Sequence, residues 1–298
     1  MKNKIFGAIW ILIAALLLSL LIIVVGKKGV TRNMFGIKLN NFTIENTFHN
    51  NLYDTQIFDV EAISNLDIKL KAESLSIEKA MDNKITVELY CTEKTAPLVY
   101  VYQNILKIEQ KKTIFGPGNR KVIIKLPATF EPGDVDINVS SGAVRISDAT
   151  FPALDLHTSS GSLKIANCKF GASNIKVTSG SISINDSEID DLDCNSTSGS
   201  IHITGSLDQF EINAVSGSIH VDLDTPFLRE SEIHATSGSV HLTLPAEQTA
   251  TVKYSVTSGA YKNDFTNTNG KQGTDSMGSN GPSLELHTTS GSVKVNRK

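Results

Sequence analysis

The feature that most constrains this chain is an internal repeat marked by the tripeptide Ser-Gly-Ser or Ser-Gly-Ala. Successive copies of its glycine lie 19, 19, 19, 18, 21, 21 and 32 residues apart. The eight glycines are Gly142, Gly161, Gly180, Gly199, Gly217, Gly238, Gly259 and Gly291. A unit of this length cannot bury an apolar core by itself, so the repeat predicts units that stack and share one core.

Aligning the repeats on the glycine produces apolar columns separated by polar columns. The column two residues after the glycine holds Val144, Leu163, Ile182, Ile201, Ile219, Val240, Tyr261 and Val293. Columns four residues after and five residues before it are also largely apolar. Alternation with period two on both sides predicts two short strands per repeat, and glycine suits the corner between them. A further apolar residue, as at Phe151, Phe170 and Ile189, would plug a short third side.

We therefore predict an all-β fold, a β-solenoid (β-helix-like) of about 19-residue coils, preceded by one N-terminal transmembrane helix. Stacked coils would place equivalent side chains directly over one another, about 4.8 Å apart. The pattern leaves one alternative open, an antiparallel sandwich in which consecutive repeats pair as hairpins. Identical columns in every repeat favour the solenoid.

The expected domain layout follows the regularity of the repeat. Residues 135–298 form the regular solenoid, with an exposed loop rich in Gly and Asn at 263–283 that accounts for the 32-residue interval. Residues 55–134 form a degenerate β-repeat region, residues 29–54 a linker and first strands, and residues 1–28 a cytoplasmic tail and transmembrane anchor.

Two stretches of the degenerate region carry the same columns in weaker form. Residues 66–70 and 75–77 match the regular repeats, with Glu73 in the glycine slot. Residues 99–108 match if Asn104 stands at a corner, because asparagine tolerates left-handed backbone geometry.

Residues 5–25 are 21 consecutive residues without a charge, and they predict a membrane-spanning helix of about 31 Å. A cleaved signal peptide is the alternative, but the run is long and no cleavage motif follows it. Two cations precede the segment and four follow it, so charge alone would place the large domain in the cytoplasm. Because the tail has only four residues, we expect it to stay inside, leaving a single-pass cell-membrane protein with an extracytoplasmic domain.

Charge is distributed unevenly along the chain. Residues 1–38 contain six Lys or Arg and no acid, which leaves 22 basic and 31 acidic side chains in the other 260 residues. A domain this acidic is repelled by phosphate backbones, so we expect no nucleic-acid partner.

Two outward columns concentrate ionisable side chains. Six residues before the glycine stand Asp136, Asp155, Asp193, Glu211, Glu232 and Glu285, and three residues after it stand Arg145, Lys164, His202, His220, His241, Lys262 and Lys294. The carboxylates could hold divalent cations, and the three histidines could bind a transition metal or protonate together below pH 6. Solvated strand faces of mixed charge explain both columns more simply, so we assign no metal site.

No catalytic constellation is visible. The chain has no G-x-S-x-G, H-E-x-x-H or P-loop motif. Cys91, Cys168 and Cys194 are widely spaced and are expected to act as isolated small hydrophobes. We therefore predict no catalytic residue, no cofactor and no enzymatic activity.

The recurrent unit Thr-Ser-Gly-Ser-Ile/Val-x-Ile/Leu, as in residues 178–184 and 236–242, resembles the hallmark of a bacterial "putative adhesin" family of unknown function. The resemblance covers about residues 55–298. It implies a β-solenoid carried by a membrane or envelope protein, and it offers no catalytic residues.

These observations favour a non-enzymatic, membrane-anchored envelope protein that binds an unknown envelope protein or glycan. The alternative is a structural or regulatory accessory of a membrane envelope-stress sensor. The third interpretation, an envelope enzyme, would require a cleft with convergent titratable groups.

Overall fold

The computed structural model describes residues 52–110 and 120–298, which lie in one compact unit, Thr47–Lys298. Within the described residues the fold is all-β, with 23 strands and two single-turn 3-10 helices, η1 (Val60–Ala62) and η2 (Glu93–Thr95). None of the helices in this part of the chain is long and apolar enough to cross a membrane. The predicted transmembrane helix at residues 5–25 lies outside the described residues.

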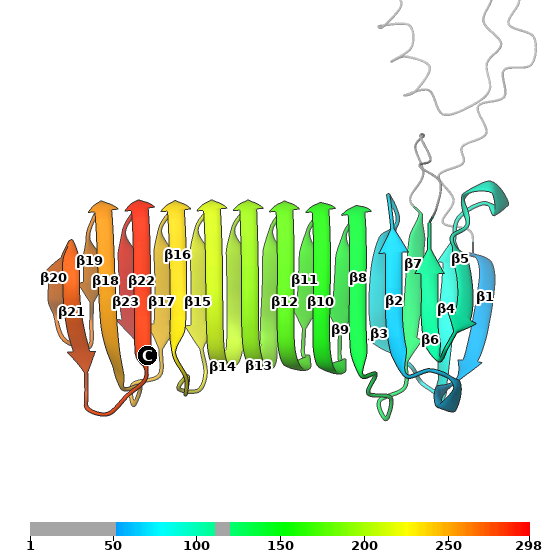
Figure 1. Ribbon diagram of the computed structural model, residues 1–298, viewed down its shortest axis with the longest axis horizontal. Helices are drawn as coiled ribbons and strands as arrows, with labels where there is room; N and C mark the ends of the chain where they lie inside the picture. The colour runs from blue at the N-terminus through cyan, green and yellow to red at the C-terminus, as the bar shows by residue number, and fades with distance from the viewer. Residues whose placement is uncertain (1–51, 111–119) are drawn as a thin grey trace, which may run out of the picture. The chain divides into compact units, whose positions relative to one another are not determined.

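The strands lie side by side in one long stack (Figure 1) and form two ladders. In spatial order, ladder A consists of β5 (Leu98–Tyr102), β6 (Ile105–Glu109), β2 (Asn65–Leu70), β8 (Asp134–Ser141), β10 (Thr150–Ser160), β12 (Lys169–Ser179), the second halves of β13 (Ile182–Ser198) and β14 (Ile201–Ser216), β16 (Ser231–Ser237), β22 (Ser283–Ser290), β18 (Ala250–Ser258) and β21 (Gln272–Met277).

Ladder B lies behind ladder A and shares β13 and β14 with it, so the whole is one large mixed sheet. In spatial order, ladder B consists of β1 (Leu52–Asp59), β4 (Lys84–Tyr90), β7 (Lys121–Leu126), β3 (Ser74–Lys79), β9 (Val144–Ser147), β11 (Leu163–Ala166), the first halves of β13 and β14, β15 (Ile219–Leu223), β17 (Val240–Leu244), β23 (Val293–Arg297), β19 (Tyr261–Asn263) and β20 (Thr268–Gly270).

The coils built around the glycines pair in parallel and in register. Ile182 pairs with Leu163 on one side and Ile201 on the other, and Ile201 pairs with Ile219. All four side chains are at most 1% exposed, because one face of each strand points into the shared interior. The all-β prediction and the stacking of equivalent residues are confirmed, and parallel pairing rules out the antiparallel sandwich.

The third side of each early coil is closed by the predicted plug residues. Phe151, Phe170, Ile189 and Leu207 pair in sequence along the stack and are at most 2% exposed. The rings of Phe151 and Phe170 stack with centroids 5.3 Å apart.

The spatial order of the coils differs from their order in the chain at both ends. The last coil, β22 and β23, lies between β16–β17 and β18–β19. The coil of β2 and β3 likewise lies inside the coil of β6 and β7. The outermost coils are those covered by antiparallel strands, β20 and β21 at one end and β1, β4 and β5 at the other. This arrangement limits the open parallel edges that could pair with another chain.

The segment at residues 263–283 differs from the exposed loop that the sequence predicts. It contains β20 and β21, which pair antiparallel with β19 and β18 and cover the end of the stack. Asp275 of β21 is 8% exposed and accepts hydrogen bonds from Tyr261 (3.2 Å), Asn263 (2.8 Å) and Thr266 (2.6 Å). The composition of this segment is typical of loops, so it did not predict that one of its carboxylates is buried and bonded to three side chains.

Asp275→Asn is expected to lower the free energy of unfolding by about 2 kcal/mol at pH 7, because hydrogen bonds to a charged acceptor are lost. Burial by itself raises the pKa of Asp275, but the donated hydrogen bonds outweigh it and leave that pKa below its ordinary value. The carboxylate therefore stabilises the fold above about pH 4, and this stability is lost as the pH falls through the lowered pKa. Urea unfolding of the wild-type protein and the Asp275→Asn variant at pH 7 and pH 3 checks this prediction. The difference in unfolding free energy between the two proteins should be smaller at pH 3, and an equal difference at both pH values would contradict the prediction.

Of the two coil-like stretches predicted in the degenerate region, one is confirmed and the other is wrong. Leu66 pairs with Val135 and Leu75 with Val144, so residues 66–77 are a true coil. Gln103 and Asn104, however, have φ values of 50° and 61° and join β5 to β6 as an antiparallel hairpin. Two consecutive left-handed residues make a tight hairpin turn rather than a coil corner, which is why the columns of residues 99–108 were misassigned.

Candidate functional surface

The corner between the ladders is lined by the glycines of the repeat. Gly180 has φ +148°, and a Cβ added to it would lie 2.0 Å from the main-chain oxygen of Gly161 in the adjacent coil. The same overlap with the neighbouring corner recurs at the other corner glycines, from Gly142 to Gly291. Glycine is therefore required by the close approach of coils as well as by the bend.

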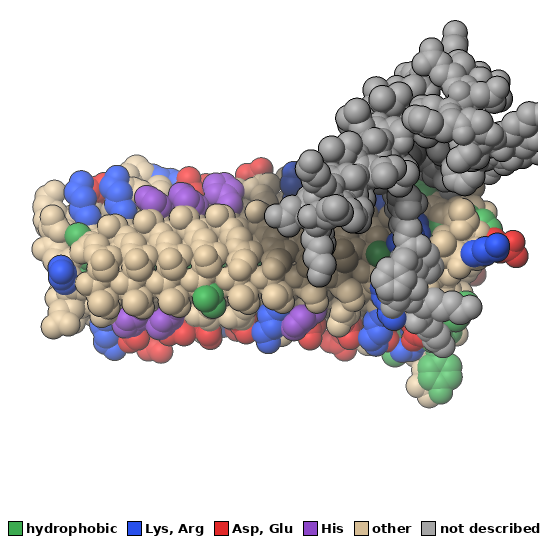
Figure 2. Space-filling view, turned by 90° about the horizontal axis from the view of Figure 1, so that it is seen from above, with side chains coloured by type: hydrophobic (Ala, Val, Ile, Leu, Met, Phe, Trp, Pro, Cys, Tyr) green, Lys and Arg blue, Asp and Glu red, His purple; other side chains and the backbone are tan. Residues whose placement is uncertain are grey.

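Exposed serines precede these glycines in every coil: Ser141, Ser160, Ser179, Ser198, Ser216, Ser237, Ser258 and Ser290. Together with the Ser and Thr residues on either side of this column they form a band that we call the hydroxyl strip. Figure 2 shows the strip, over the part of the stack that is in view, as a band without charged side chains. An exception to its polarity is Val215, which is 52% exposed.

The acidic column lies on the outer face of ladder A. Asp136, Asp155, Asp193, Glu211, Glu232 and Glu285 occupy its positions, and Asp67 pairs with Asp136 at one end. Several of these carboxylates are neutralised on the same face. Asp67 bonds Lys69 (2.8 Å) and Lys107 (2.6 Å), and Glu285 bonds Lys253 (2.8 Å).

At two positions of the acidic column, burial and a neighbouring carboxylate together raise the pKa of an aspartate. Burial, and then the neighbouring Asp67, raises the pKa of Asp136. Burial, and then Glu211, raises the pKa of Asp193. In the described ranges no group of three or more His, Cys, Asp or Glu side chains is arranged to hold a metal ion. The stacked carboxylates thus lie in a line instead of converging on a point.

A second column, which we call the cation column, lies on the outer face of ladder B. It contains, in spatial order, Arg145, Lys164, Ser183, His202, His220, His241, Lys294 and Lys262. The three histidine rings are neighbours, as the repeat alignment predicts. The centroids of His220 and His241 are 4.7 Å apart at an interplanar angle of 9°, and those of His202 and His220 are 6.2 Å apart.

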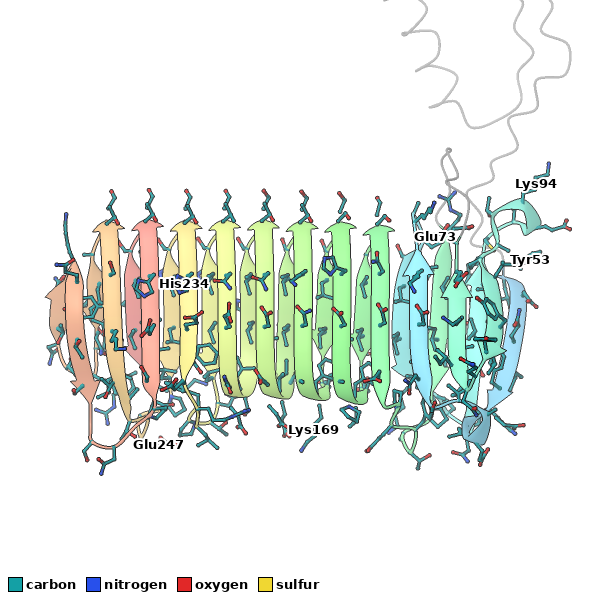
Figure 3. All side chains as sticks on the ribbon, viewed as in Figure 1. Tyr53, Glu73, Lys94, Lys169, His234 and Glu247 are labelled. Atoms are coloured by element: carbon teal, nitrogen blue, oxygen red, sulfur yellow. The ribbon has the colours of Figure 1, made fainter. Side chains whose placement is uncertain are left out.

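Another group of histidines lies on ladder A beside the acidic column. His234 and His287 stack at 4.6 Å, and Figure 3 shows His234 on the front of the stack. Their imidazoles lie 3.4 Å and 3.7 Å from Glu232 and Glu285. These rings have carboxylate partners, whereas the three histidines of the cation column form no ion pair within the described residues.

A groove of about 470 Å³ lies on the third side of the coils. It is lined by residues including Asp148, Cys168, Lys169 and Glu188. Cys168 is 4% exposed and its thiol lies 3.2 Å from the main-chain oxygen of Ala166. Burial raises the pKa of this thiol, which therefore makes it a poor nucleophile. Cys194 is fully buried in a core column, and burial raises its pKa too.

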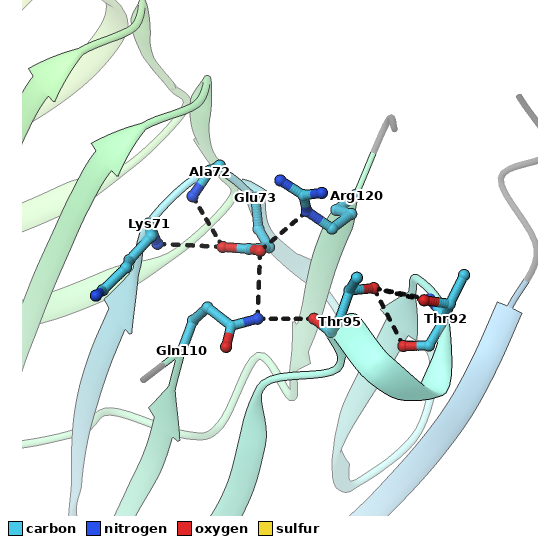
Figure 4. A network of polar contacts seen from close by, with 7 residues as sticks. All are labelled: Lys71, Ala72, Glu73, Thr92, Thr95, Gln110 and Arg120. Atoms are coloured by element: carbon cyan, nitrogen blue, oxygen red, sulfur yellow. Dashed lines mark hydrogen bonds and ion pairs between the residues drawn. The ribbon is translucent and has the colours of Figure 1, made fainter. Parts of the chain in front are cut away.

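The polar cluster around Glu73 was only partly foreseen from the sequence. Glu73 occupies a glycine slot, since a Cβ on Gly142 would lie 2.3 Å from its main-chain oxygen. Its carboxylate, 1% exposed, accepts hydrogen bonds from Arg120 (3.1 Å), Gln110 (3.4 Å) and the main-chain nitrogens of residues 71 and 72 (Figure 4). All of these bonds are internal, and the cluster joins the inner coil to β6 and β7.

An apolar surface on β1 and β5 was not predicted from the sequence. Of the ten large hydrophobic side chains that are exposed among the described residues, seven lie on these two outer strands: Leu52, Tyr53, Ile57, Leu98, Tyr100, Val101 and Tyr102. Alternation on β1 and β5 resembles that of the core strands, so a partly apolar outward face could not be distinguished from an inward one.

Comparison with known protein families identifies the family to which the repeats belong. The Toastrack DUF4097 family matches residues 63–296. The chain belongs to this family. The resemblance drawn from the Thr-Ser-Gly-Ser unit is thereby confirmed.

One structure similar to the toastrack chain is that of a putative adhesin from Bacteroides fragilis, with 14% identity, a TM-score of 0.52, and coverage of 82% of this chain and 96% of that one. A putative adhesin from Parabacteroides merdae has 12% identity, a TM-score of 0.48, and coverage of 81% and 95%. A putative lipid binding protein from Parabacteroides distasonis has 16% identity, a TM-score of 0.47, and coverage of 81% and 96%. At 14% identity the Bacteroides fragilis structure shows the fold alone. No curated protein matches the sequence.

Proposed function

We propose that this toastrack protein is a non-enzymatic, membrane-anchored envelope protein that displays its coils as a β-solenoid for binding a protein or a cell-wall partner. The observation that carries the proposal is the hydroxyl strip, which runs beside two straight charged columns. Long, flat polar faces favour broad contact with an extended partner over enclosure of a small molecule. Parallel coils with a continuous core also hold these faces rigid.

The apolar side chains on β1 and β5 favour a second candidate, an accessory of a membrane envelope-stress sensor. Tyr53, Tyr100 and Tyr102 are aromatic side chains of the kind enriched at interfaces between water and membranes or protein partners. In that role β1 and β5, and not the hydroxyl strip, would contact the partner.

Labelling on intact cells tests the proposed display. A Ser179→Cys variant in a Cys91→Ser background should react with a membrane-impermeant maleimide before lysis, because Ser179 is exposed while Cys168 and Cys194 are buried. The same background without the new cysteine is the control. Labelling that occurs only after lysis would place the domain in the cytoplasm and contradict the proposal.

A further inference from the structure

The cation column is unlike the other charged surfaces of the molecule because its charges have few partners. Within the described residues Arg145, Lys164 and the three histidines form no ion pair. Lys262 and Lys294, at the far end, approach Asp264 at 3.0 Å and 4.0 Å. The acidic column, by contrast, is repeatedly bonded to Lys and His side chains.

The surroundings of the three histidines are cationic or neutral on most sides. Lys164 and Arg145 precede them in the column, beyond Ser183, and Lys294 and Lys262 follow them. On one flank lie serines of the hydroxyl strip. On the other flank the charged groups are Asp222 and Asp264, and Asp222 is bonded to Lys298 at 2.7 Å.

The three imidazoles make the charge of the cation column depend on the pH. Burial, and then the neighbouring His241 and His202, lowers the pKa of His220. Histidine is the side chain that ordinarily changes charge between pH 5 and 8, so acid adds positive charge to the four permanent cations of the column. Because its pKa is lowered, His220 gains its charge at a lower pH than an isolated imidazole does. Adjacent positive charges repel, and a bound anion that lies along the column would relieve that repulsion.

We propose that the cation column binds a linear acidic polysaccharide laid along the stack, and that this binding is tighter below pH 6 than at neutral pH. The inference names a partner class for the proposed binding role and rests on that role. Eight positions spaced at about 4.8 Å make a straight row of about 34 Å, one residue wide. Such a row matches an extended polymer with regularly spaced carboxylates.

The parallel hydroxyl strip supports a polysaccharide over other polyanions. Its serines supply donors and acceptors beside the cations, where a polysaccharide has sugar hydroxyls. Duplex DNA would need a broad basic surface, but this row is one residue wide, lies beside an uncharged strip and belongs to a domain with an excess of acidic side chains.

The test uses the full-length protein in detergent and fluorescein-labelled polygalacturonate, whose carboxylates stay ionised at pH 5.5 and 7.5. Anisotropy titrations at low salt should show binding about tenfold tighter at pH 5.5. Replacing His202, His220 and His241 together by Gln should remove that increase. Lys164→Gln should weaken binding at both pH values.

A matched control is the triple replacement of His157, His234 and His287 by Gln, which removes the same number of imidazoles from ladder A. This variant should keep the tenfold pH response. The inference is overturned if both triple variants respond alike, if neutral dextran binds as well as polygalacturonate, or if duplex DNA binds more tightly than either.

Sedimentation with isolated cell walls tests the proposed role separately. Wall binding that the replacement of His202, His220 and His241 weakens at pH 5.5 would support the cation column as the site. Wall binding that is unchanged would overturn the column as the site and leave the envelope-binding role intact.

Discussion

Gly180→Val is expected to lower the free energy of unfolding by about 4 kcal/mol. About 2 kcal/mol comes from holding a β-branched residue at φ +148°, and about 2 kcal/mol from moving the adjacent coil away from a side chain placed 2.0 Å from the oxygen of Gly161. For a domain of this size the loss corresponds to roughly 10 °C in melting temperature. Thermal unfolding followed by circular dichroism measures it.

Two comparisons separate the causes of that loss. Ser179→Val changes an exposed neighbour in the hydroxyl strip and should shift the melting temperature by no more than a degree or two. Gly142→Ala should be less harmful than Gly161→Ala, because both place a Cβ against a main-chain oxygen but only Gly161 has a φ in the left-handed range, +151°. An unchanged melting temperature for Gly180→Val would show that the corner can relax and that the close approach of neighbouring coils does not require glycine there.

Glu73→Ala is expected to cost about 3 to 4 kcal/mol of folding free energy. The substitution leaves Arg120, whose side chain is 9% exposed, without its carboxylate, and it removes the acceptor of two main-chain N–H groups. Guanidinium chloride unfolding measures the loss. Because the cluster joins the inner coil to the outer one, amide exchange in β6 and β7 should rise first.

Conservative and paired substitutions control the interpretation. Glu73→Gln retains most of the volume and should cost less than Glu73→Ala. Adding Arg120→Met to Glu73→Leu should recover part of the stability, because the guanidinium is then no longer buried without a counterion. If Glu73→Ala unfolds at the same guanidinium concentration as the wild-type chain, the cluster does not hold the two coils together.

The sequence predicted the structure correctly where each column of the repeat alignment corresponds to one position in the coil. Leu163, Ile182 and Ile201 could be placed over one another because an inward position in a parallel ladder recurs at the repeat period. The neighbourhood of His202, His220 and His241 followed from the same alignment. Candidate surfaces on the regular coils were therefore accessible from the sequence.

Prediction failed where contacts join residues that are not one repeat apart. The hairpin turn at Asn104 satisfies the same apolar pattern as a corner, so only the antiparallel pairing of β5 with β6 distinguishes them. Glu73 and Arg120 are 47 residues apart and lie at neighbouring corners, because β3 pairs with β7. That interval is not a repeat period, so nothing in the repeat pointed to their ion pair.

The amino-acid sequence by itself determined the structure of each coil. The glycine positions mark where the backbone turns, the hydroxyl positions mark side chains that face water, and the apolar positions mark side chains that face the core. Tertiary structure alone decided the order of coils at the two ends. Successive coils present nearly equivalent edges, so local pattern cannot say which one lies outermost. That choice depends on which edge an antiparallel strand can cover, as β21 covers β18, and no column of the repeat encodes that pairing.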